Sequence, residues 1–174
     1  MVDFSKRDVS EIERCDLNIK VAREFVEAFT GRAIISQAWK ATDEKFPCGR
    51  YIKISKGPIK SVDSVKYWPY DGGAQATLSD SSYLALCEDD GVTIMLRTGY
   101  SWPSTDERPD AIEINFTAGY SDATRVPESL KQAIRVIAAD EADYATQYIT
   151  GTILTPVPNR IQSLLLPHKI NGFC

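Results

Sequence analysis

The sequence predicts an α+β fold in which two long helices pack with a small antiparallel β-sheet or sandwich. Two observations support this class. Apolar residues recur every three or four positions over about residues 9–30 and again over about 127–148, which is typical of helices with one buried face. Between them, over about residues 33–120, short runs alternate apolar with polar residues and are separated by glycine-containing turns. We expect about six to eight strands in this middle block.

The first helix is expected to end at Gly31. Residues 22–30 carry their apolar side chains at helical spacing, whereas residues 33–39 have the composition of a strand. Glycine can adopt the left-handed backbone conformation that closes a helix, where a residue with a Cβ would be strained. The sequence therefore places the helix stop, and the helix-to-strand junction, at Gly31.

Two β-hairpins are expected within the middle block. Asp71-Gly72 is expected to join a strand near residues 66–68 to another near 76–78. Asp90-Gly91 is expected to join a strand near residues 83–86 to another near 92–96 as a second hairpin. Asp-Gly is a favoured two-residue hairpin turn because both positions tolerate positive φ.

The second long helix is expected to start at Pro127 and to fade near Tyr148. Proline suits the first helical position, because its missing N–H would have no partner there. We therefore expect a single α+β domain over residues 1–150 and an extended C-terminal arm over 151–174.

The arm is expected to hold a short helix after the stiff segment Pro156-Val157-Pro158. The apolar residues of this part are Ile161, Leu164, Leu165, Leu166 and Pro167. One core cannot easily cover apolar side chains on all sides of so short a helix. The pattern favours a peptide that docks on a neighbouring protein in a groove. The alternative is a segment that folds back over the sheet as a lid.

The composition and the motifs give little sign of catalysis. The net charge of −4 argues against a general affinity for nucleic acid. The single histidine, His168, lies just past Pro167, outside any predicted framework that would orient a catalytic base. The sequence contains no GxSxG, GxxxxGK[ST], GxGxxG or HExxH motif. We expect no enzyme activity and no cofactor.

The cysteines do not indicate a metal site. They are Cys15, Cys48, Cys87 and Cys174. None belongs to a CxxC pair, so a zinc site is not expected. We expect the cysteines to be free thiols in a reducing cytoplasm. Glu88-Asp89-Asp90 lacks the alternating spacing of a calcium loop and is interpreted as a solvated hairpin tip. No run approaches the ~20 apolar residues of a membrane span, so no membrane partner is expected.

Asp140, Glu141 and Asp143 on the second long helix leave one enzymatic alternative open. Neighbouring acids can bind a metal or transfer protons. Since no second ligand set accompanies them, a solvated or interface face is the preferred interpretation. The alternative from another class is a small metal-dependent enzyme centred on these three acids.

Most aromatic residues lie in the strand block and are interpreted as packing residues. Trp68 and Trp102 stand beside prolines in turns and are expected to be exposed, as aromatic residues at protein interfaces often are. A third possibility is a single-stranded nucleic-acid module that stacks bases on the sheet aromatics. The negative net charge argues against it.

Three ordered stretches of the sequence resemble one protein family. They are residues 22–39 (AREFVEAFTGRAIISQAW); Phe46-Pro47 with residues 57–65 (GPIKSVDSV); and Trp102-Pro103 with residues 116–120 (FTAGY) and 126–134 (VPESLKQAI). In this order and spacing they resemble the head–tail connector proteins, also called adaptor or head-completion proteins, of long-tailed bacteriophages and gene transfer agents. The resemblance covers about residues 10–140.

The resemblance implies a structural virion protein rather than an enzyme. Connector proteins of this kind form a ring, typically of twelve copies, that joins the portal to the stopper or the tail and lets DNA pass. The implied partners are further copies of the chain, the portal, a stopper or tail-terminator protein, and packaged DNA that is not bound specifically. The implied location is the virion neck, after assembly in the host cytoplasm. A neighbouring stopper or tail-completion ring is the alternative within this class.

The resemblance also implies roles for residues. The arm from about residue 158 would dock on the portal through the apolar residues named above. Gly31 would mark the passage from the ring-forming helix to the sheet. The candidates for the lining of the DNA channel are Glu128, Asp140, Glu141 and Asp143. Negative charge there would keep DNA from sticking, since phosphate binding grows with the number of cationic contacts.

Overall fold

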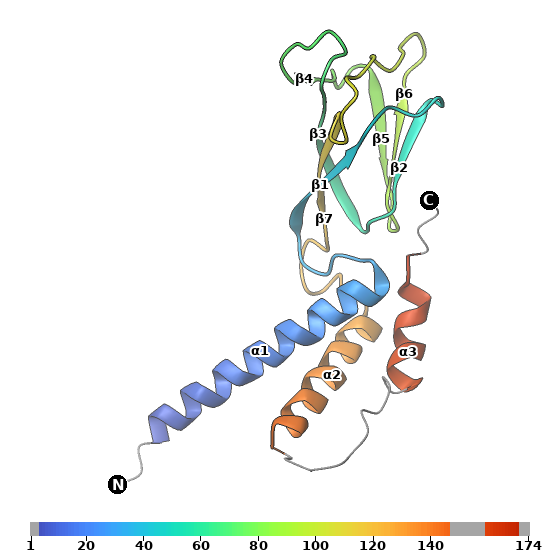
Figure 1. Cartoon of the computed structure of the whole chain (residues 1–174). Coiled ribbons are helices and arrows are strands. Elements are labelled where there is room, and N and C mark those ends of the chain that lie inside the picture. Colours follow the sequence, from blue (N-terminus) through green and yellow to red (C-terminus); the bar gives the residue numbers. More distant parts are fainter. Residues whose placement is uncertain (1–3, 147–158, 171–174) are drawn as a thin grey trace. The chain divides into compact units, whose positions relative to one another are not determined.

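A computed structural model describes residues 4–146 and 159–170 of the chain (Figure 1). These residues form three α-helices, one 3-10 helix and seven strands, so the α+β class is confirmed. The chain divides into two compact units. Among the described residues, a helical unit combines residues 4–30 with 126–146 and 159–169, and a sheet unit combines residues 31–125 with residue 170. This division differs from the expected single domain with an arm, because the segment after residue 158 packs with the helices.

The helical unit consists of α1, α2, α3 and a terminal 3-10 helix. Their bounds are Phe4–Thr30 for α1, Glu128–Thr146 for α2, Asn159–Leu165 for α3 and Leu166–His168 for η1. α1 thus begins earlier than the sequence predicts, and α2 occupies nearly the expected range. α2 packs against both α1 and α3. None of the helices in the described part of the chain is long and apolar enough to cross a lipid bilayer.

A small apolar core holds the helical unit together. Its buried side chains are Ala22 and Val26 of α1, Leu130 and Ala133 of α2, and Ile161 and Leu165 of α3. Within each helix they stand three or four residues apart, so each helix turns one face toward the other two. Burial of a large aliphatic side chain contributes about 1.5–3 kcal/mol, which makes the short α3 an integral part of this unit.

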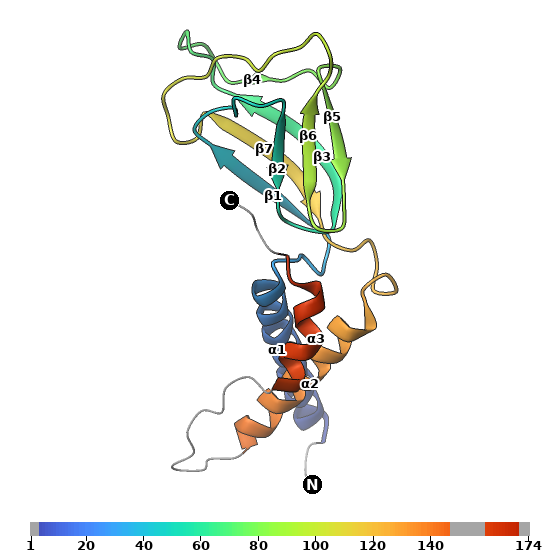
Figure 2. The same ribbon diagram turned by 90° about the vertical axis from the view of Figure 1, so that its right-hand side faces the viewer.

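The sheet unit is built from antiparallel strands in two sheets (Figure 2). The four-stranded sheet has the order β1 (Gln37–Asp43), β7 (Ile112–Ala118), β3 (Ile59–Tyr67) and β4 (Ala76–Thr77). The three-stranded sheet has the order β2 (Tyr51–Ile54), β6 (Val92–Leu96) and β5 (Tyr83–Cys87). Both expected hairpins are present, as the β3–β4 and β5–β6 pairs.

One hydrophobic core draws on the inner faces of both sheets. Burial alternates along β7, where Ile112, Ile114 and Phe116 point inward. Val92 and Ile94 of β6 belong to the same cluster. The middle block is therefore a β-sandwich, which leaves each sheet with one outward face.

Candidate functional site

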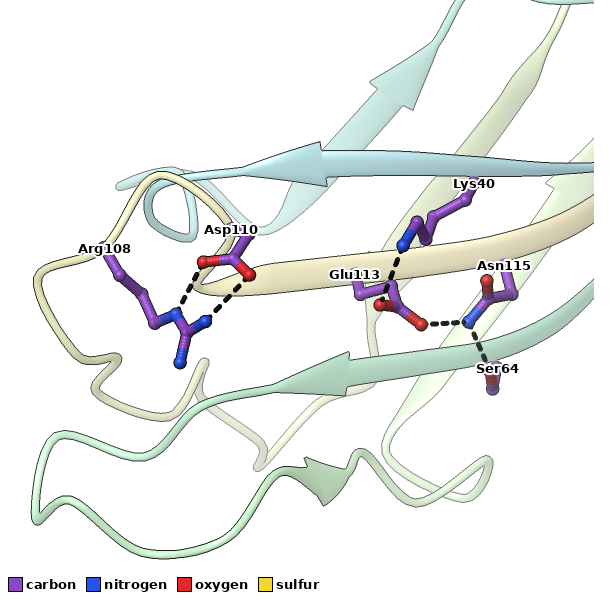
Figure 3. Close-up of polar contacts among 6 residues, drawn as sticks. All are labelled: Lys40, Ser64, Arg108, Asp110, Glu113 and Asn115. Atoms are coloured by element: carbon purple, nitrogen blue, oxygen red, sulfur yellow. Dashed lines mark hydrogen bonds and ion pairs between the residues drawn. The ribbon is translucent and has the colours of Figure 1, made fainter.

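The outward face of the four-stranded sheet carries a hydrogen-bonded polar row (Figure 3). The side-chain amide of Asn115 donates to Glu113 Oε1 at 2.8 Å and to Ser64 Oγ at 3.2 Å. Lys40 Nζ lies 3.5 Å from Glu113 Oε2. The hydrogen bond from Asn115 and the charge of Lys40 lower the pKa of the Glu113 carboxyl. These groups satisfy one another, so this face is suited to contact with water.

Arg108 lies in the loop that precedes β7 of the same sheet, and its side chain pairs with Asp110 (Figure 3). Its guanidinium donates two hydrogen bonds to the Asp110 carboxylate, at 2.5 and 2.8 Å. This pairing raises the pKa of Arg108 and lowers that of Asp110. The guanidinium also lies 4.3 Å from the centroid of the Trp68 ring. Trp68 is half-buried.

Trp102 is half-buried as well. Its ring stacks on Phe46, with 4.7 Å between the centroids, and its Nε1 donates to the carbonyl oxygen of Gly49 at 2.8 Å. The expectation that Trp68 and Trp102 are exposed is wrong, because the chain packs both rings against its own side chains. An interface role for either residue stays a prediction.

The outward face of the three-stranded sheet is apolar. Tyr51 of β2 pairs with Met95 of β6, which pairs in turn with Leu84 of β5. Leu86 stands two residues further along β5, on the same side of the strand. All four side chains are exposed large hydrophobics. We name Tyr51, Leu84, Leu86 and Met95 the apolar row.

The helix stop lies where the sequence predicts it, and Arg32 reinforces it. Gly31 has φ of +73°, in the left-handed region. Arg32 Nη1 donates to the backbone oxygen of Asp89 at 2.8 Å and lies 3.8 Å from Asp89 Oδ2. Burial raises the pKa of the nearby Tyr120 hydroxyl, while Arg32 acts in the opposite direction. The chain is thereby tied to the β5–β6 hairpin directly after the stop.

The C-terminal helix is packed rather than free. Ile161 and Leu165 are buried in the helical unit, and Leu164 is half-buried. Leu166 and Pro167 are exposed, with Leu166 at 57%. Ser129 Oγ and His168 Nε2 lie 2.6 Å apart, which ties η1 to the first turn of α2. The described part of the segment packs onto α2 and α1, and only part of its apolar surface remains accessible within the helical unit.

The predicted acidic residues of α2 occupy different environments. Glu128 is exposed and lies 2.5 Å from Lys131 Nζ, and the hydrogen bond from this lysine lowers the pKa of its carboxyl. Glu141 is exposed and Asp140 is half-buried. The side chain of Asp143 lies outside the described residues. Among those that are described, no group of three or more His, Cys, Asp or Glu side chains could hold a metal ion.

Comparison with known proteins reveals similarity in structure only. No family profile and no curated protein matches the sequence. The full chain aligns with 84% of a chain in the neck of an empty GTA particle, computed with C6 symmetry, with a TM-score of 0.72 and 18% identity. The chain has the fold of a gene transfer agent neck chain.

Two further solved structures have a similar fold. One is the virion of a native gene transfer agent (GTA) particle, with a TM-score of 0.70, 18% identity, and coverage of 90% of this chain and 77% of that one. The other is the neck of a native GTA particle computed with C12 symmetry, with a TM-score of 0.69, 18% identity, and coverage of 90% and 82%. At this level of identity the likeness establishes a shared fold.

The apolar row is a feature that the sequence predictions missed. Tyr83-Leu84-Ala85-Leu86-Cys87 is continuously apolar, which resembles a strand buried on both faces. In the structure Tyr83 is buried whereas Leu84 and Leu86 are exposed. The available signal was the position of this run in an antiparallel hairpin, since such sheets commonly turn one face to solvent.

Proposed function

We propose that this chain is a structural protein of the neck of a phage-like particle and has no catalytic role. The observation that carries the proposal is the fold shared with gene transfer agent neck chains over the full length of the sequence. Two of these necks were computed with sixfold and twelvefold symmetry, which supports assembly of the chain into a ring. The ordered sequence stretches that resemble connector proteins support the same class independently.

Within the neck, we infer that the chain is the head-to-tail adaptor, which joins the portal to the stopper or tail. Only the accessible part of the C-terminal segment is proposed to dock on the portal. Leu166 and Pro167 are exposed and Leu164 is half-buried, whereas Ile161 and Leu165 support the helical core. A docking surface centred on Leu166 keeps the helical unit intact when the portal binds.

For the lining of the DNA channel, Glu128 and Glu141 are the candidates with exposed side chains. Glu128 shares its charge with Lys131, so Glu141 presents the less compensated carboxylate of the two. Acidic groups near passing DNA repel phosphates and form no lasting contacts. This role is part of the adaptor proposal and depends on it.

The adaptor proposal is tested by mixing the purified chain with the portal ring encoded in the same genome. Negative-stain images should show one added ring on the portal. Leu166→Asp should reduce the fraction of portals with the added ring at least about tenfold, which corresponds to about 1.4 kcal/mol. The matched control is Ser163→Asp, which places the same charge at an exposed position of α3. The control should bind as the wild type does.

The outcomes separate the alternatives within the neck. If the chain binds no bare portal but adds a ring to a portal that already carries another neck protein, it is the stopper or a tail-completion protein. If Leu166→Asp and Ser163→Asp bind equally well, the portal contacts another surface of the chain. Thermal unfolding followed by circular dichroism confirms that each variant is folded.

A further inference from the structure

Exposed apolar side chains are concentrated in the N-terminal half of α1. Among the described residues of the helical unit, five large hydrophobic side chains are exposed, and four of them lie within ten residues of this helix. They are Ile12, Leu17, Ile19 and Val21, with exposed fractions of 60%, 59%, 50% and 44%. Exposed apolar side chains that gather in this way mark a site of interaction.

These side chains lie on two opposite sides of the helix. Ile12 and Ile19, with the exposed Cys15 between them, continue the face that is buried further along α1. We name these three residues the front stripe. Leu17 and Val21 stand four residues apart on the other side, and we name them the back stripe. At 3.6 residues per turn, the mean directions of the two stripes differ by about 170°.

Packing within the helical unit accounts for only part of one side. α2 and α3 pack against the C-terminal half of α1, where Ala22 and Val26 are buried. The front stripe lies beyond this packed region, and the back stripe lies on the far side of the helix from it. A helix with one partner needs only one apolar face, so two open apolar faces indicate two further contacts.

The symmetry of the similar neck structures explains why there are two faces. These structures were computed with sixfold and twelvefold symmetry, which supports a ring of identical copies. Each copy in a ring uses two different surfaces, one for each neighbour, whereas a twofold dimer uses one surface twice. For a helix that stands along the axis of a twelvefold ring, the two surfaces face about 150° apart. The directions of the front and back stripes are close to this arrangement.

The charged side chains of the same stretch favour contact between unlike stripes. Glu11 and Asp16 are exposed beside the front stripe. Further along this side, the half-buried Arg23 engages Glu27 at 4.0 Å. Front stripe against front stripe would bring four carboxylates of two copies together, which like-charge repulsion disfavours. The exposed charges beside the back stripe balance one another and are Glu13, Arg14, Lys20 and Glu24.

We propose that the front stripe on α1 of one copy packs against the back stripe on α1 of the neighbouring copy. This inference rests on the proposed ring. Equivalent residues of copies around a ring axis stand at the same height, so Leu17 of one copy is level with the space between Cys15 and Ile19 of the next. Because α2 and α3 occupy this side beyond Ala22, the two α1 helices cross at their N-terminal halves.

Thiol crosslinking tests the contact, because Cys15 already places a thiol in the front stripe. The other three cysteines are replaced by serine, and Leu17→Cys adds a thiol to the back stripe. A short bismaleimide is added to the isolated chain at high concentration and to the chain mixed with the portal. A single helix crossing covers less than the roughly 1,200 Å² of a stable interface, so the crosslinker is needed to trap it. We expect a ladder of dimers, trimers and larger covalent species on a denaturing gel.

Single-thiol proteins and a displaced thiol are the controls. Cys15 alone, or Leu17→Cys combined with Cys15→Ser, should give dimers at most, since only one stripe then carries a thiol. Lys20→Cys in place of Leu17→Cys puts the second thiol at an exposed position between the stripes and should give at most a faint ladder. A two-thiol protein that stops at dimers, the absence of crosslinks in both mixtures, or an equal ladder from the Lys20→Cys control would each overturn the proposal. Circular dichroism checks that each variant is folded, and Val21→Cys is the second variant for the back stripe.

An added charge gives a second readout. Ile19→Asp should reduce trimers and larger species at least about fivefold, because it places a carboxylate within the apolar contact. Asn18→Asp adds the same charge one residue away, between the stripes, and should change the ladder less than about twofold. Equal effects would overturn the assignment of the front stripe. If the ladder forms but no ring is seen on the portal, the contact stands and the neck proposal fails. If rings form on the portal and the ladder is absent there, only the contact is rejected.

Discussion

At the residue scale, Gly31 and Arg32 determine how the chain leaves α1. Gly31 has φ of +73°, which ends the helix, and the next residue binds the backbone and carboxylate of Asp89. The side chain of Arg32 is only 11% exposed, so its charge depends on these partners. The helix thus ends at Gly31 through its backbone conformation, and the next residue, Arg32, holds the chain through its side chain.

Gly31→Val should destabilise the folded chain by about 1–2 kcal/mol. The reason is that a β-branched residue is strained in the left-handed region. Urea unfolding followed by circular dichroism measures the change in the free energy of unfolding. Gly49→Val is the matched control, because Gly49 has ordinary φ and no atom within 4 Å of an added Cβ. Equal effects of the two substitutions would contradict the role of Gly31.

Tyr83 should make stability fall at high pH. Burial, with the hydrogen bond that its hydroxyl donates to Asp80, raises the pKa of Tyr83 to about 12. In the unfolded chain the tyrosine ionises near pH 10. The contribution of the protonated Tyr83 to the stability of the folded chain is therefore complete below pH 10 and is lost as the pH rises toward 12. Between pH 9 and 11 the wild type should lose about 1 kcal/mol more than Tyr83→Phe.

Denaturant unfolding of both proteins at several pH values checks this difference. The comparison cancels the titration of groups that the two proteins share. Parallel curves for wild type and Tyr83→Phe would show that Tyr83 ionises equally easily in the folded and unfolded chain.

At the element scale, each helix of the helical unit is covered to a different degree. α1 is 27 residues long, and its described side chains are buried only toward its C-terminal end, at Ala22, Val26 and Thr30. Ile12 and Ile19 continue the same stripe but are exposed. α3 is short, yet its Ile161 and Leu165 are almost fully buried. Length is therefore a poor guide to how much each helix contributes to the core.

Leu165→Ala should destabilise the chain by about 2–5 kcal/mol, because it leaves a cavity in the helical core. Leu166→Ala should change stability by less than about 0.5 kcal/mol, since this side chain is 57% exposed. The two adjacent substitutions remove the same atoms, so each is the control for the other. Thermal unfolding measures the difference. A small effect at Leu165 would mean that α3 is a loosely attached arm after all.

At the scale of the whole molecule, the chain consists of a helical unit and a β-sandwich. The chain enters the sandwich once at Gly31 and returns to the helices near Val126. The sandwich thus forms an insertion between α1 and α2. This arrangement keeps both long helices in one unit although about a hundred residues separate them in sequence.

The intact chain should not bind double-stranded DNA appreciably. Its net charge is −4, and affinity for DNA grows with the number of phosphates that cations neutralise. Fluorescence anisotropy with a labelled duplex should show no saturable binding below about 100 µM protein at low salt, which is weaker than typical non-specific binders. Tight binding that weakens steeply with salt would contradict a passive role toward DNA.

Much of the fold could be predicted because it depends on local patterns. The helical repeats, Gly31 and the Asp-Gly turns each act over a few residues, and each appears near its predicted position. The exposure of Trp68 and Trp102 could not be predicted in this way. Their partners, Arg108 and Phe46, lie tens of residues away in the sequence. The candidate sites depend on such contacts and were predicted less well.

The sequence by itself determined the α+β class, the helix stop and the absence of known catalytic motifs, because hydrophobic periodicity and backbone preferences are local. Only the tertiary structure decided that α3 belongs to the helical core and that Leu84, Leu86, Met95 and Tyr51 meet on an open face. Burial depends on what the rest of the chain brings to each side of an element. An apolar side chain has the same hydrophobicity in a core and at an interface, and only its neighbours distinguish the two.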